Sequence, residues 1–238
     1  MEFAFTEEQE MIRDTAASFL AEVSGSEAIR AAMATEQGYD SELWQRICGE
    51  LYWQAIHVPE AYGGMGLGYV EVVAMMEQMG RHLLCSPFFS TVCLAANALL
   101  VAGSEEQKAQ WLGKLCEGDL TATLAFNGGG RAWNADSVTA TWHREGDGYV
   151  LNGCKQFVPE GMAANLVIVA ARTSGAAPRM AITPRVGRPS KFPPQAATVN
   201  SRVTPTATVS ANPRLVPVLS ATGKGRSRGR SAPNMGRR

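Results

Sequence analysis

The sequence predicts an α+β fold, in which an all-α helical domain, residues 1–118, precedes a small, incomplete β-barrel-like domain, residues 119–173. Apolar residues recur at spacings of three and four through the first part of the chain, which is typical of amphipathic helices. After Asp119, short threonine-rich and valine-rich runs separated by glycines favour strands. Helices followed by strands, without alternation, indicate two segregated domains rather than βαβ units.

Charge divides the chain after residue 173. Residues 1–173 contain 10 basic and 22 acidic residues, whereas residues 174–238 contain 12 basic residues and no acidic one. This tail also holds nine of the twelve prolines and a single aromatic residue, Phe192, so it cannot bury enough apolar area to offset its ordering entropy. We expect residues 174–238 to be disordered, as a basic tail or as the product of a shifted reading frame.

The cysteines and histidines give no sign of a disulfide framework or a metal site. The five cysteines are scattered and none forms a C-x-x-C pair, which is typical of free thiols in a reducing compartment. His57, His82 and His143 lie far apart in the sequence, without metal-ligand spacing. The N-terminus lacks a secretory signal pattern, and the longest apolar run is too short to span a bilayer. A cytoplasmic protein without metal or membrane segment is expected.

Helix start signals define the first domain. Thr6–Gln9 and Ser104–Gln107 both fit capping boxes. Asp40 or Ser41 can cap a second helix, whose inner face holds Leu43, Trp44, Ile47 and Leu51. These signals predict where three of about five helices begin.

A glycine-rich loop and two further helices complete the helical domain. Four glycines between Gly63 and Gly68 predict a shaped loop, followed by a helix over Tyr69–Leu84. Ser86-Pro87 then precedes the almost uncharged stretch Phe88–Ala102. A helix without a polar face should be buried nearly all round.

Three short runs and one turn signal predict the strands of the second domain. Leu120–Phe126 and Val138–His143 alternate threonine with apolar residues, as half-buried strands do. Asn152-Gly153 predicts a tight hairpin turn, with Cys154–Val158 as the returning strand. Leu166–Ala170 is apolar throughout, as in a strand that is covered on both faces.

The order of these features resembles the N-terminal two-thirds of an acyl-CoA dehydrogenase. Phe5–Gln9 is similar to the family's opening helix, and Pro59–Gly66 to the loop after its second helical segment. Gly103–Gly118 resembles the helix that leads into the middle domain, and Asn152–Thr173 the family's N-G-x-K-x-aromatic-aliphatic strand pair. The resemblance covers roughly residues 3–173 and rests on the order and spacing of all four motifs.

The resemblance implies FAD-dependent α,β-dehydrogenation of an acyl-CoA thioester. In the family a glutamate base removes the α proton, hydride leaves the β carbon for the flavin, and an electron-transfer flavoprotein reoxidises it. The base lies in a C-terminal helical bundle that also contributes to the oligomer, and this sequence has no counterpart of that bundle. No catalytic residue is therefore predicted, and this chain alone is expected to have no dehydrogenase activity.

The resemblance also implies which residues form the flavin site. Two groups match the family's flavin wall by position: Thr123, Ala125 and Phe126 on the strand beside the isoalloxazine ring, and Phe157, Val158 and Pro159 on its other side. Phe126 stands where a threonine is usual, and Pro159 where a second hydroxyl is usual, so donors to the flavin edge are lost. Since a neutral hydrogen bond contributes roughly 0.5–1.5 kcal/mol net, weaker FAD binding or altered flavin electronics is expected.

Alternatives remain open. Arg131 can contact a CoA phosphate or lie solvated in its loop. The chain can also be a non-catalytic or degenerate subunit that associates with a related subunit in a homo- or hetero-oligomer. Basic tail residues such as Arg226 and Arg228 can neutralise phosphates, but neither interleaved aromatic residues nor a nucleic-acid-binding motif accompanies them. Nucleic-acid binding is the least favoured reading.

Overall fold

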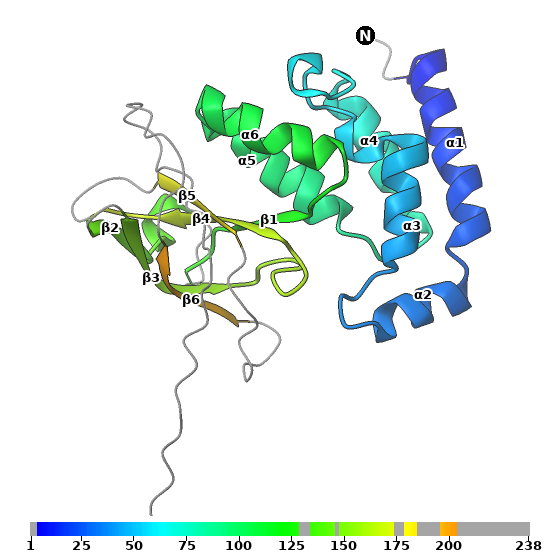
Figure 1. Cartoon of the computed structure of the whole chain (residues 1–238). Helices are drawn as coiled ribbons and strands as arrows, with labels where there is room; N and C mark the ends of the chain where they lie inside the picture. The colour runs from blue at the N-terminus through cyan, green and yellow to red at the C-terminus, as the bar shows by residue number, and fades with distance from the viewer. Residues whose placement is uncertain (1–3, 129–133, 146–147, 174–178, 185–195, 204–238) are drawn as a thin grey trace, which may run out of the picture.

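The computed structural model describes residues 4–128, 134–145, 148–173, 179–184 and 196–203, with the helices before the strands (Figure 1). The α-helices are α1 (Glu7–Val23), α2 (Ser26–Ala34), α3 (Ser41–Arg46), α4 (Tyr69–Arg81), α5 (Asn97–Ala102) and α6 (Glu105–Cys116). Shorter or wider helical segments are η1 (Ile47–Leu51), η2 (Trp53–Ala55), η3 (Glu60–Tyr62), η4 (Phe89–Ala96) and η5 (Ala135–Ser137). The strands are β1 (Ala122–Ala125), β2 (Thr141–Glu145), β3 (Gly148–Gln156), β4 (Leu166–Ala171), β5 (Arg179–Pro184) and β6 (Ala196–Val203). This order confirms the α+β prediction.

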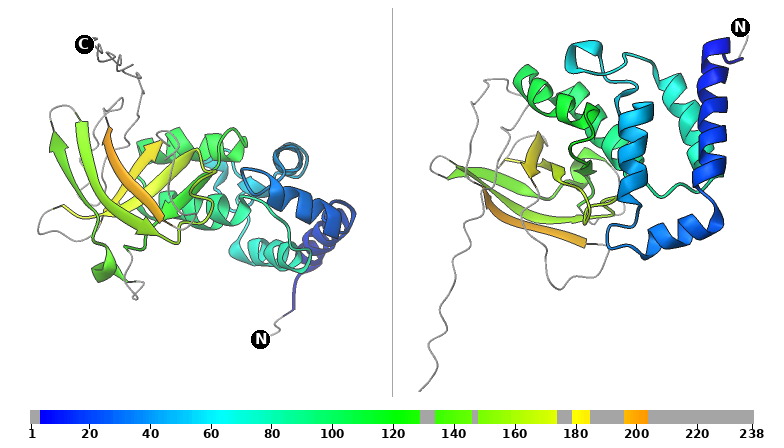
Figure 2. Two further views of the ribbon diagram at one scale, coloured as in Figure 1. Left: turned by 90° about the horizontal axis from the view of Figure 1, so that it is seen from below. Right: turned by 45° about the vertical axis from the view of Figure 1, so that its right-hand side comes forward.

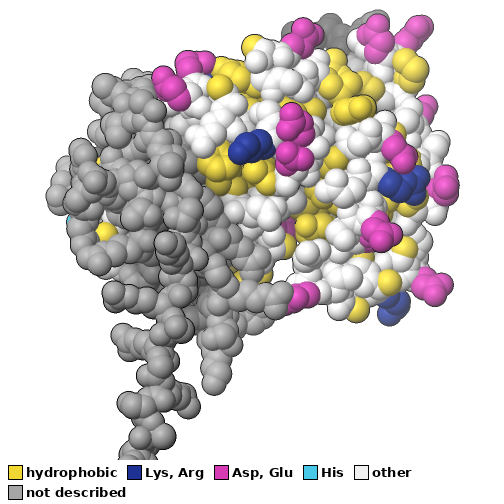
Figure 3. All heavy atoms as spheres, viewed as in Figure 1, with side chains coloured by type: hydrophobic (Ala, Val, Ile, Leu, Met, Phe, Trp, Pro, Cys, Tyr) yellow, Lys and Arg dark blue, Asp and Glu magenta, His cyan; other side chains and the backbone are white. Residues whose placement is uncertain are grey.

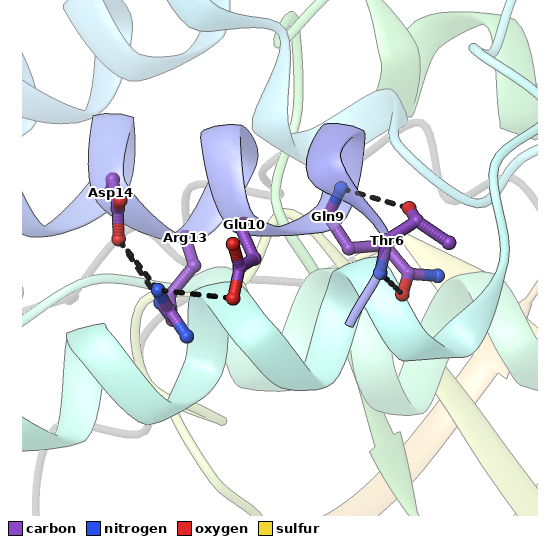
Figure 4. Close-up of polar contacts among 5 residues, drawn as sticks. All are labelled: Thr6, Gln9, Glu10, Arg13 and Asp14. Carbon is purple, nitrogen blue, oxygen red and sulfur yellow. Dashed lines mark hydrogen bonds and ion pairs between the residues drawn. The ribbon is translucent and has the colours of Figure 1, made fainter. Parts of the chain in front are cut away.

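The first helix begins at the predicted capping box. Thr6 Oγ1 accepts from the backbone N–H of Gln9 at 3.3 Å, and Gln9 Oε1 accepts from the backbone N–H of Thr6 at 3.0 Å (Figure 4). Gln9 Nε2 also donates to Glu71 Oε1 at 2.8 Å. Because Glu71 lies in the first turn of α4, the cap of α1 also ties the two helices together.

The region between α1 and η2 differs from the prediction. Helix α2 was not expected from the sequence, since its N-cap, Gly25, has no side chain to mark a helix start. The predicted helix after Asp40 exists, and Asp40 Oδ1 accepts from the backbone N–H groups of Glu42 and Leu43 at 2.9 and 3.1 Å. It continues as the π-helix η1 and ends at Tyr52, which has a φ of 54°.

The uncharged stretch Phe88–Ala102 is helical, as η4 followed by α5. Val92, Ala95 and Leu99 are buried, as predicted. The expectation of burial nearly all round has two exceptions, because Phe89 and Val101 are 46% and 82% exposed. This helical stretch therefore has an outer face, although that face carries no charge.

The strands form two three-stranded sheets, in the orders β1-β4-β5 and β2-β3-β6. β1 is parallel to β4, with Ala122 opposite Leu166, and the other pairs are antiparallel. The sheets meet where Arg172 N donates to Ala140 O and Trp142 N donates to Arg172 O, both at 2.8 Å. Figure 2 shows the sheets together on one side of the molecule, with α1 at the far end.

The predicted turn at Asn152-Gly153 is wrong. Both residues lie inside β3, and the hairpin of β2 and β3 closes instead between Glu145 and Gly148. Gly153 has a φ of 150°, and a Cβ there would lie 2.7 Å from Cα of Ala140. The glycine therefore allows two backbones to approach closely rather than forming a turn.

The expectation that residues 174–238 are disordered is corrected at two places. β5 pairs with β4, with Pro184 opposite Leu166, and β6 pairs with β3, with Ala196 opposite Gln156. Both segments gain backbone hydrogen bonds from a strand already in place, which composition alone does not reveal. Residues 204–238, including the basic residues considered for nucleic-acid binding, lie outside the described residues.

A shared core joins the helices to the first sheet. Leu112 and Leu115 of α6 pack in one buried cluster with Ala122 of β1 and with Leu166 and Ile168 of β4. A second cluster lies within the helices, and a third lies between the sheets. This cluster thus holds β1, where the predicted flavin wall begins, against α6.

Candidate functional site

The structure brings the two predicted segments of the flavin wall together. One hydrogen bond joins them directly, from Thr123 Oγ1 to Pro159 O (2.7 Å). Two more involve the adjoining residues, from Lys155 Nζ to Phe126 O (2.8 Å) and from Gln156 N to Asn127 O (3.1 Å). The end of β1 therefore lies beside the end of β3, although about thirty residues separate them in the sequence. These bonds fix the spacing of the two segments.

Phe157 is the most exposed residue of the predicted wall. Its φ is 52° and its side chain is 59% exposed. A left-handed conformation is uncommon for a bulky residue and persists only where surrounding contacts hold it. The next residue, Val158, packs on the buried cluster between the sheets. An aromatic ring is thus presented to the outside on a well-supported backbone.

Two of the six predicted wall residues are buried. The side chains of Thr123 and Ala125 are both fully inaccessible, and the Thr123 hydroxyl gives its proton to Pro159 O. Phe126, Val158 and Pro159 are half-buried. Arg131 lies outside the described residues. The accessible part of the wall is therefore smaller than the sequence suggested.

Lys155 is a buried cation that the sequence analysis treated only as a motif position. Its side chain is 1% exposed, and Nζ donates to Phe126 O. Burial lowers the pKa of Lys155 to about 8, while the neighbouring Cys154 acts in the opposite direction. Strand alternation could have found it, because Lys155 shares the inward face of β3 with Leu151.

Glu160 is a second ionisable residue that sequence reasoning missed. Its φ is 48°, and Oε2 is buried, with no donor to it among the residues that the structure describes. Burial raises the pKa of Glu160, and the nearby polar groups of Ser90 act in the opposite direction. Ser90 is seventy positions earlier in the chain, so no local pattern could have paired the two residues.

A threonine at the start of η4 fixes the helix to β1. Thr91 Oγ1 accepts from Ala122 N at 3.1 Å and lies 3.3 Å from Ala122 O, to which it can donate. Thr91 is fully buried, so these bonds are shielded from water. The first turn of η4 is therefore attached directly to β1.

A hollow of about 680 Å³ adjoins the loop after β3. The turn between α2 and α3 lines it together with Met162, Ala163 and Asn165, and its acidic residues are Glu36, Asp40 and Glu42. It contains none of the predicted wall residues. Acidic side chains are also frequent on the helical face in Figure 3, in keeping with the acidic composition of residues 1–173.

The described residues contain neither a candidate metal site nor a candidate membrane-spanning helix. Among them, no group of three or more histidine, cysteine, aspartate or glutamate side chains could hold a metal ion. No helix in the described part of the chain is both long and apolar enough to cross a bilayer.

Comparison with known proteins places these observations in a family. Residues 6–119 match the family described as acyl-CoA dehydrogenase, N-terminal domain. Acyl-CoA dehydrogenase IpdE2 of Mycobacterium tuberculosis is 37% identical over 51% of this chain and 37% of its own length. Mitochondrial isovaleryl-CoA dehydrogenase of Pongo abelii is 34% identical over 72% of this chain and 41% of its own length.

A solved structure shares the fold as well as the sequence pattern. The ChsE4-ChsE5 complex from Mycobacterium tuberculosis matches with a TM-score of 0.68 and 28% identity, over 77% of this chain and 49% of the matched chain. This chain thus spans less than half the length of these three proteins.

Proposed function

Because the chain belongs to the acyl-CoA dehydrogenase family and matches its N-terminal part, we propose that it provides one wall of an FAD site for α,β-dehydrogenation of an acyl-CoA. The accessible wall consists of Phe126, Phe157, Val158 and Pro159. One observation carries the proposal: the exposed ring of Phe157 stands on a left-handed backbone beside a strand that hydrogen bonds hold in place.

These residues fit the apolar face of an isoalloxazine ring better than its polar edge. Phe157 and Val158 offer an aromatic and an aliphatic surface for packing. Pro159 has no N–H, and Thr123 gives its single hydroxyl proton to Pro159 O, so neither side chain donates to a flavin. Bound FAD would supply the hydride acceptor. In this proposal, the chain holds one face of the ring and keeps water away from it.

The rest of the reaction requires groups beyond this wall. The family resemblance implies a glutamate base from a C-terminal helical bundle and an electron-transfer flavoprotein as electron acceptor. None of the four accessible wall residues carries a group that could remove a proton, so we propose that this wall has no dehydrogenase activity alone and acts in an oligomer with a related subunit. The ChsE4-ChsE5 complex is an example of two components assembled together among the structural neighbours.

A non-catalytic subunit is the alternative function. The inward-turned hydroxyl of Thr123 and the imide nitrogen of Pro159 favour it, because both weaken polar recognition of a flavin. Such a subunit would associate with a related one without holding FAD. The contact of Arg131 with CoA and the binding of nucleic acid by the tail stay predictions.

Flavin retention tests the proposal. The purified chain is mixed with FAD, passed through gel filtration and examined for flavin absorbance, then treated with an acyl-CoA under anaerobic conditions. We expect retained FAD that is not bleached until a subunit carrying the C-terminal bundle is added. Phe157→Ala should lose FAD, whereas Phe89→Ala, at another exposed phenylalanine, should not. Equal retention by both variants would exclude the wall, and no FAD in the unmodified chain would favour the alternative.

A further inference from the structure

Two arginines of the helical domain have no partner, although the domain is rich in carboxylates. Residues 4–118 contain 16 acidic and 6 basic residues. Arg30 and Arg81 form neither an ion pair nor a side-chain hydrogen bond with any residue that the structure describes. The other four basic side chains each contact a carboxylate or an aromatic ring: Arg13 with Asp14, Arg46 with Glu50, Lys108 with Glu105 and Lys114 with Trp111. Arg30 and Arg81 are therefore available to an external anion.

Arg30 and Arg81 line the same hollow, although they belong to different helices. Arg30 lies in the middle of α2 and Arg81 is the last residue of α4. The hollow has a volume of about 550 Å³, which lies within the range of small-molecule sites, roughly 300–1,000 Å³. Its other lining residues are Ser24, Ser26, Ile29, Met33, His82 and Leu83. None of these described lining residues is acidic, so the two positive charges share the hollow without a counter-charge.

A hydrogen bond between the ends of two helices holds the hollow in shape. Ser24 follows the last residue of α1, and its hydroxyl donates to His82 O at 2.9 Å. His82 follows the last residue of α4 in the same way. Because the Ser24 residue is only 8% exposed, this bond is largely shielded from water. The two sides of the hollow are thus joined in the free protein, without help from a ligand.

Leu83 combines a strained backbone with an exposed side chain. Its φ is 50° and its side chain is 67% exposed. It ends α4 in a Schellman motif, in which Leu83 N donates to Gly80 O at 3.2 Å and Leu84 N donates to Met79 O at 3.0 Å. Glycine usually occupies this left-handed position, because a residue with a Cβ is strained there. Strain of this kind is frequent at ligand sites, and here it presents an apolar side chain to the hollow.

The hollow therefore offers an apolar surface beside its two cations. Met33 is 67% exposed, like Leu83, and lies one turn after Arg30 on α2, so the two side chains are neighbours on the helix surface. A guanidinium group binds phosphate oxygens through two parallel N–H donors, and two such groups match the charge of a dianion. The apolar side chains match a short hydrocarbon group attached to that dianion.

We propose that this hollow binds a phosphate monoester that carries a short apolar group. Arg30 and Arg81 bind the phosphate, and Met33 and Leu83 contact the apolar group. The Ser26 hydroxyl can donate to a further phosphate oxygen. The inference goes beyond the proposed function, because the hollow contains none of the predicted wall residues.

Calorimetric titration of the full chain with hexyl phosphate tests the site. The measurement is made at low ionic strength and about pH 7.5, where a phosphate monoester is mostly a dianion. We expect saturable binding at one site, roughly tenfold tighter than that of inorganic phosphate, because the hexyl chain buries apolar surface. Hexanol, which has the chain without the charge, should not bind. No saturable binding of hexyl phosphate, or equal binding of hexanol, would overturn the proposal.

Charge variants show whether the two arginines make the site. Arg30→Gln and Arg81→Gln should each weaken hexyl phosphate binding by roughly tenfold or more, since each removes a charged hydrogen-bond donor. Arg46→Gln is the matched control, because Arg46 is also an exposed arginine of this domain but is paired with Glu50. Equal weakening by all three variants would mean general charge attraction and would overturn the site.

Leu83→Gly separates a ligand contact from a structural role. Glycine suits the left-handed backbone, so the midpoint of thermal unfolding should stay the same or rise. Hexyl phosphate should nevertheless bind several-fold more weakly, whereas the affinity for inorganic phosphate should not change. Unchanged affinity for hexyl phosphate would contradict the assigned role of Leu83.

Vesicles distinguish a soluble ligand from a lipid headgroup, which presents the same phosphate chemistry. The full chain should bind soluble hexyl phosphate and should not sediment with phosphatidylcholine vesicles that contain phosphatidic acid, because the alkyl chain of a bilayer lipid is not free to enter the hollow. Sedimentation with these vesicles that Arg30→Gln and Arg81→Gln abolish, without binding of hexyl phosphate, would overturn the proposal in favour of a membrane surface.

Discussion

The Thr123 hydroxyl donates a hydrogen bond to the carbonyl oxygen of Pro159, with 2.7 Å between the two oxygens. The bond joins a buried strand to a loop with strained backbone, and it uses the only proton that the hydroxyl can give. A residue matched by position to a flavin contact thus serves the fold instead.

Thr123→Val should lower stability rather than flavin binding. Valine keeps the shape of threonine but leaves Pro159 O without its donor, so the free energy of unfolding should fall by about 1–3 kcal/mol. Denaturant unfolding measures this change, and Thr141→Val at an exposed position of β2 is the control. Lost FAD binding with unchanged stability would show that the hydroxyl faces the flavin after all.

Gly153→Ala should be costly although it adds one methyl group. The new Cβ would lie 2.7 Å from Cα and Cβ of Ala140, and a φ of 150° is a conformation that residues with a Cβ rarely adopt. Overpacking of this kind destabilises by roughly 1–3 kcal/mol. Gly80→Ala, within α4 and with open space around it, should instead stabilise by about 0.5–1 kcal/mol. Thermal unfolding of the two variants should give shifts of opposite sign.

Lys155 should make the protein more stable as pH rises. Its folded pKa of about 8 is below the ordinary value of 10.5, so the folded state binds fewer protons than the unfolded state between these pH values. Stability therefore increases through this window. Lys155→Met should remove the increase, which is measured as the difference between the two unfolding free energies from pH 7 to 10.5. The comparison with Lys155→Met is needed because the raised thiol pKa values of Cys48, Cys93 and Cys116 make the protein less stable as pH rises.

His57 should contribute to the loss of stability in acid. Burial lowers its pKa, and its ring nitrogen Nε2 lies 3.0 Å from Asn97 Oδ1, while no described group is bonded to Nδ1. Protonation then favours the unfolded state as pH falls through the ordinary value of 6.5. His57→Gln keeps a donor for Asn97 without ionising and should reduce the acid loss between pH 7 and 5. His143→Gln, at an exposed histidine, should leave the unfolding profile unchanged, and equal effects of both variants would contradict the assignment.

Local signals in the sequence predicted local structure well. The capping boxes at Thr6 and Ser104 are both formed, because each depends on residues three positions apart. The turn predicted at Asn152-Gly153 is wrong for the opposite reason. The dipeptide suits a turn, but the pairing of β2 with β3 places it within a strand. Strand register depends on distant partners, and a dipeptide carries no information about them.

The sequence predicted which two segments form the candidate site but not how their side chains are arranged. The family motifs located the strand with Thr123 and the loop with Phe157. They did not show that the Thr123 side chain turns inward or that the Glu160 carboxyl is buried. Both depend on where η4 lies against the loop, which follows from packing between the two domains rather than from any short stretch of sequence.

The buried cluster of Leu112, Leu115, Ala122, Leu166 and Ile168 crosses the predicted domain boundary between residues 118 and 119. Neither half can melt without exposing apolar side chains of the other, so the helices and the first sheet should unfold as one cooperative unit with a single calorimetric transition. A fragment cut at residue 118 would expose half of that cluster and would be prone to aggregate. The boundary is therefore a change of secondary structure and not a place where the polypeptide can be divided.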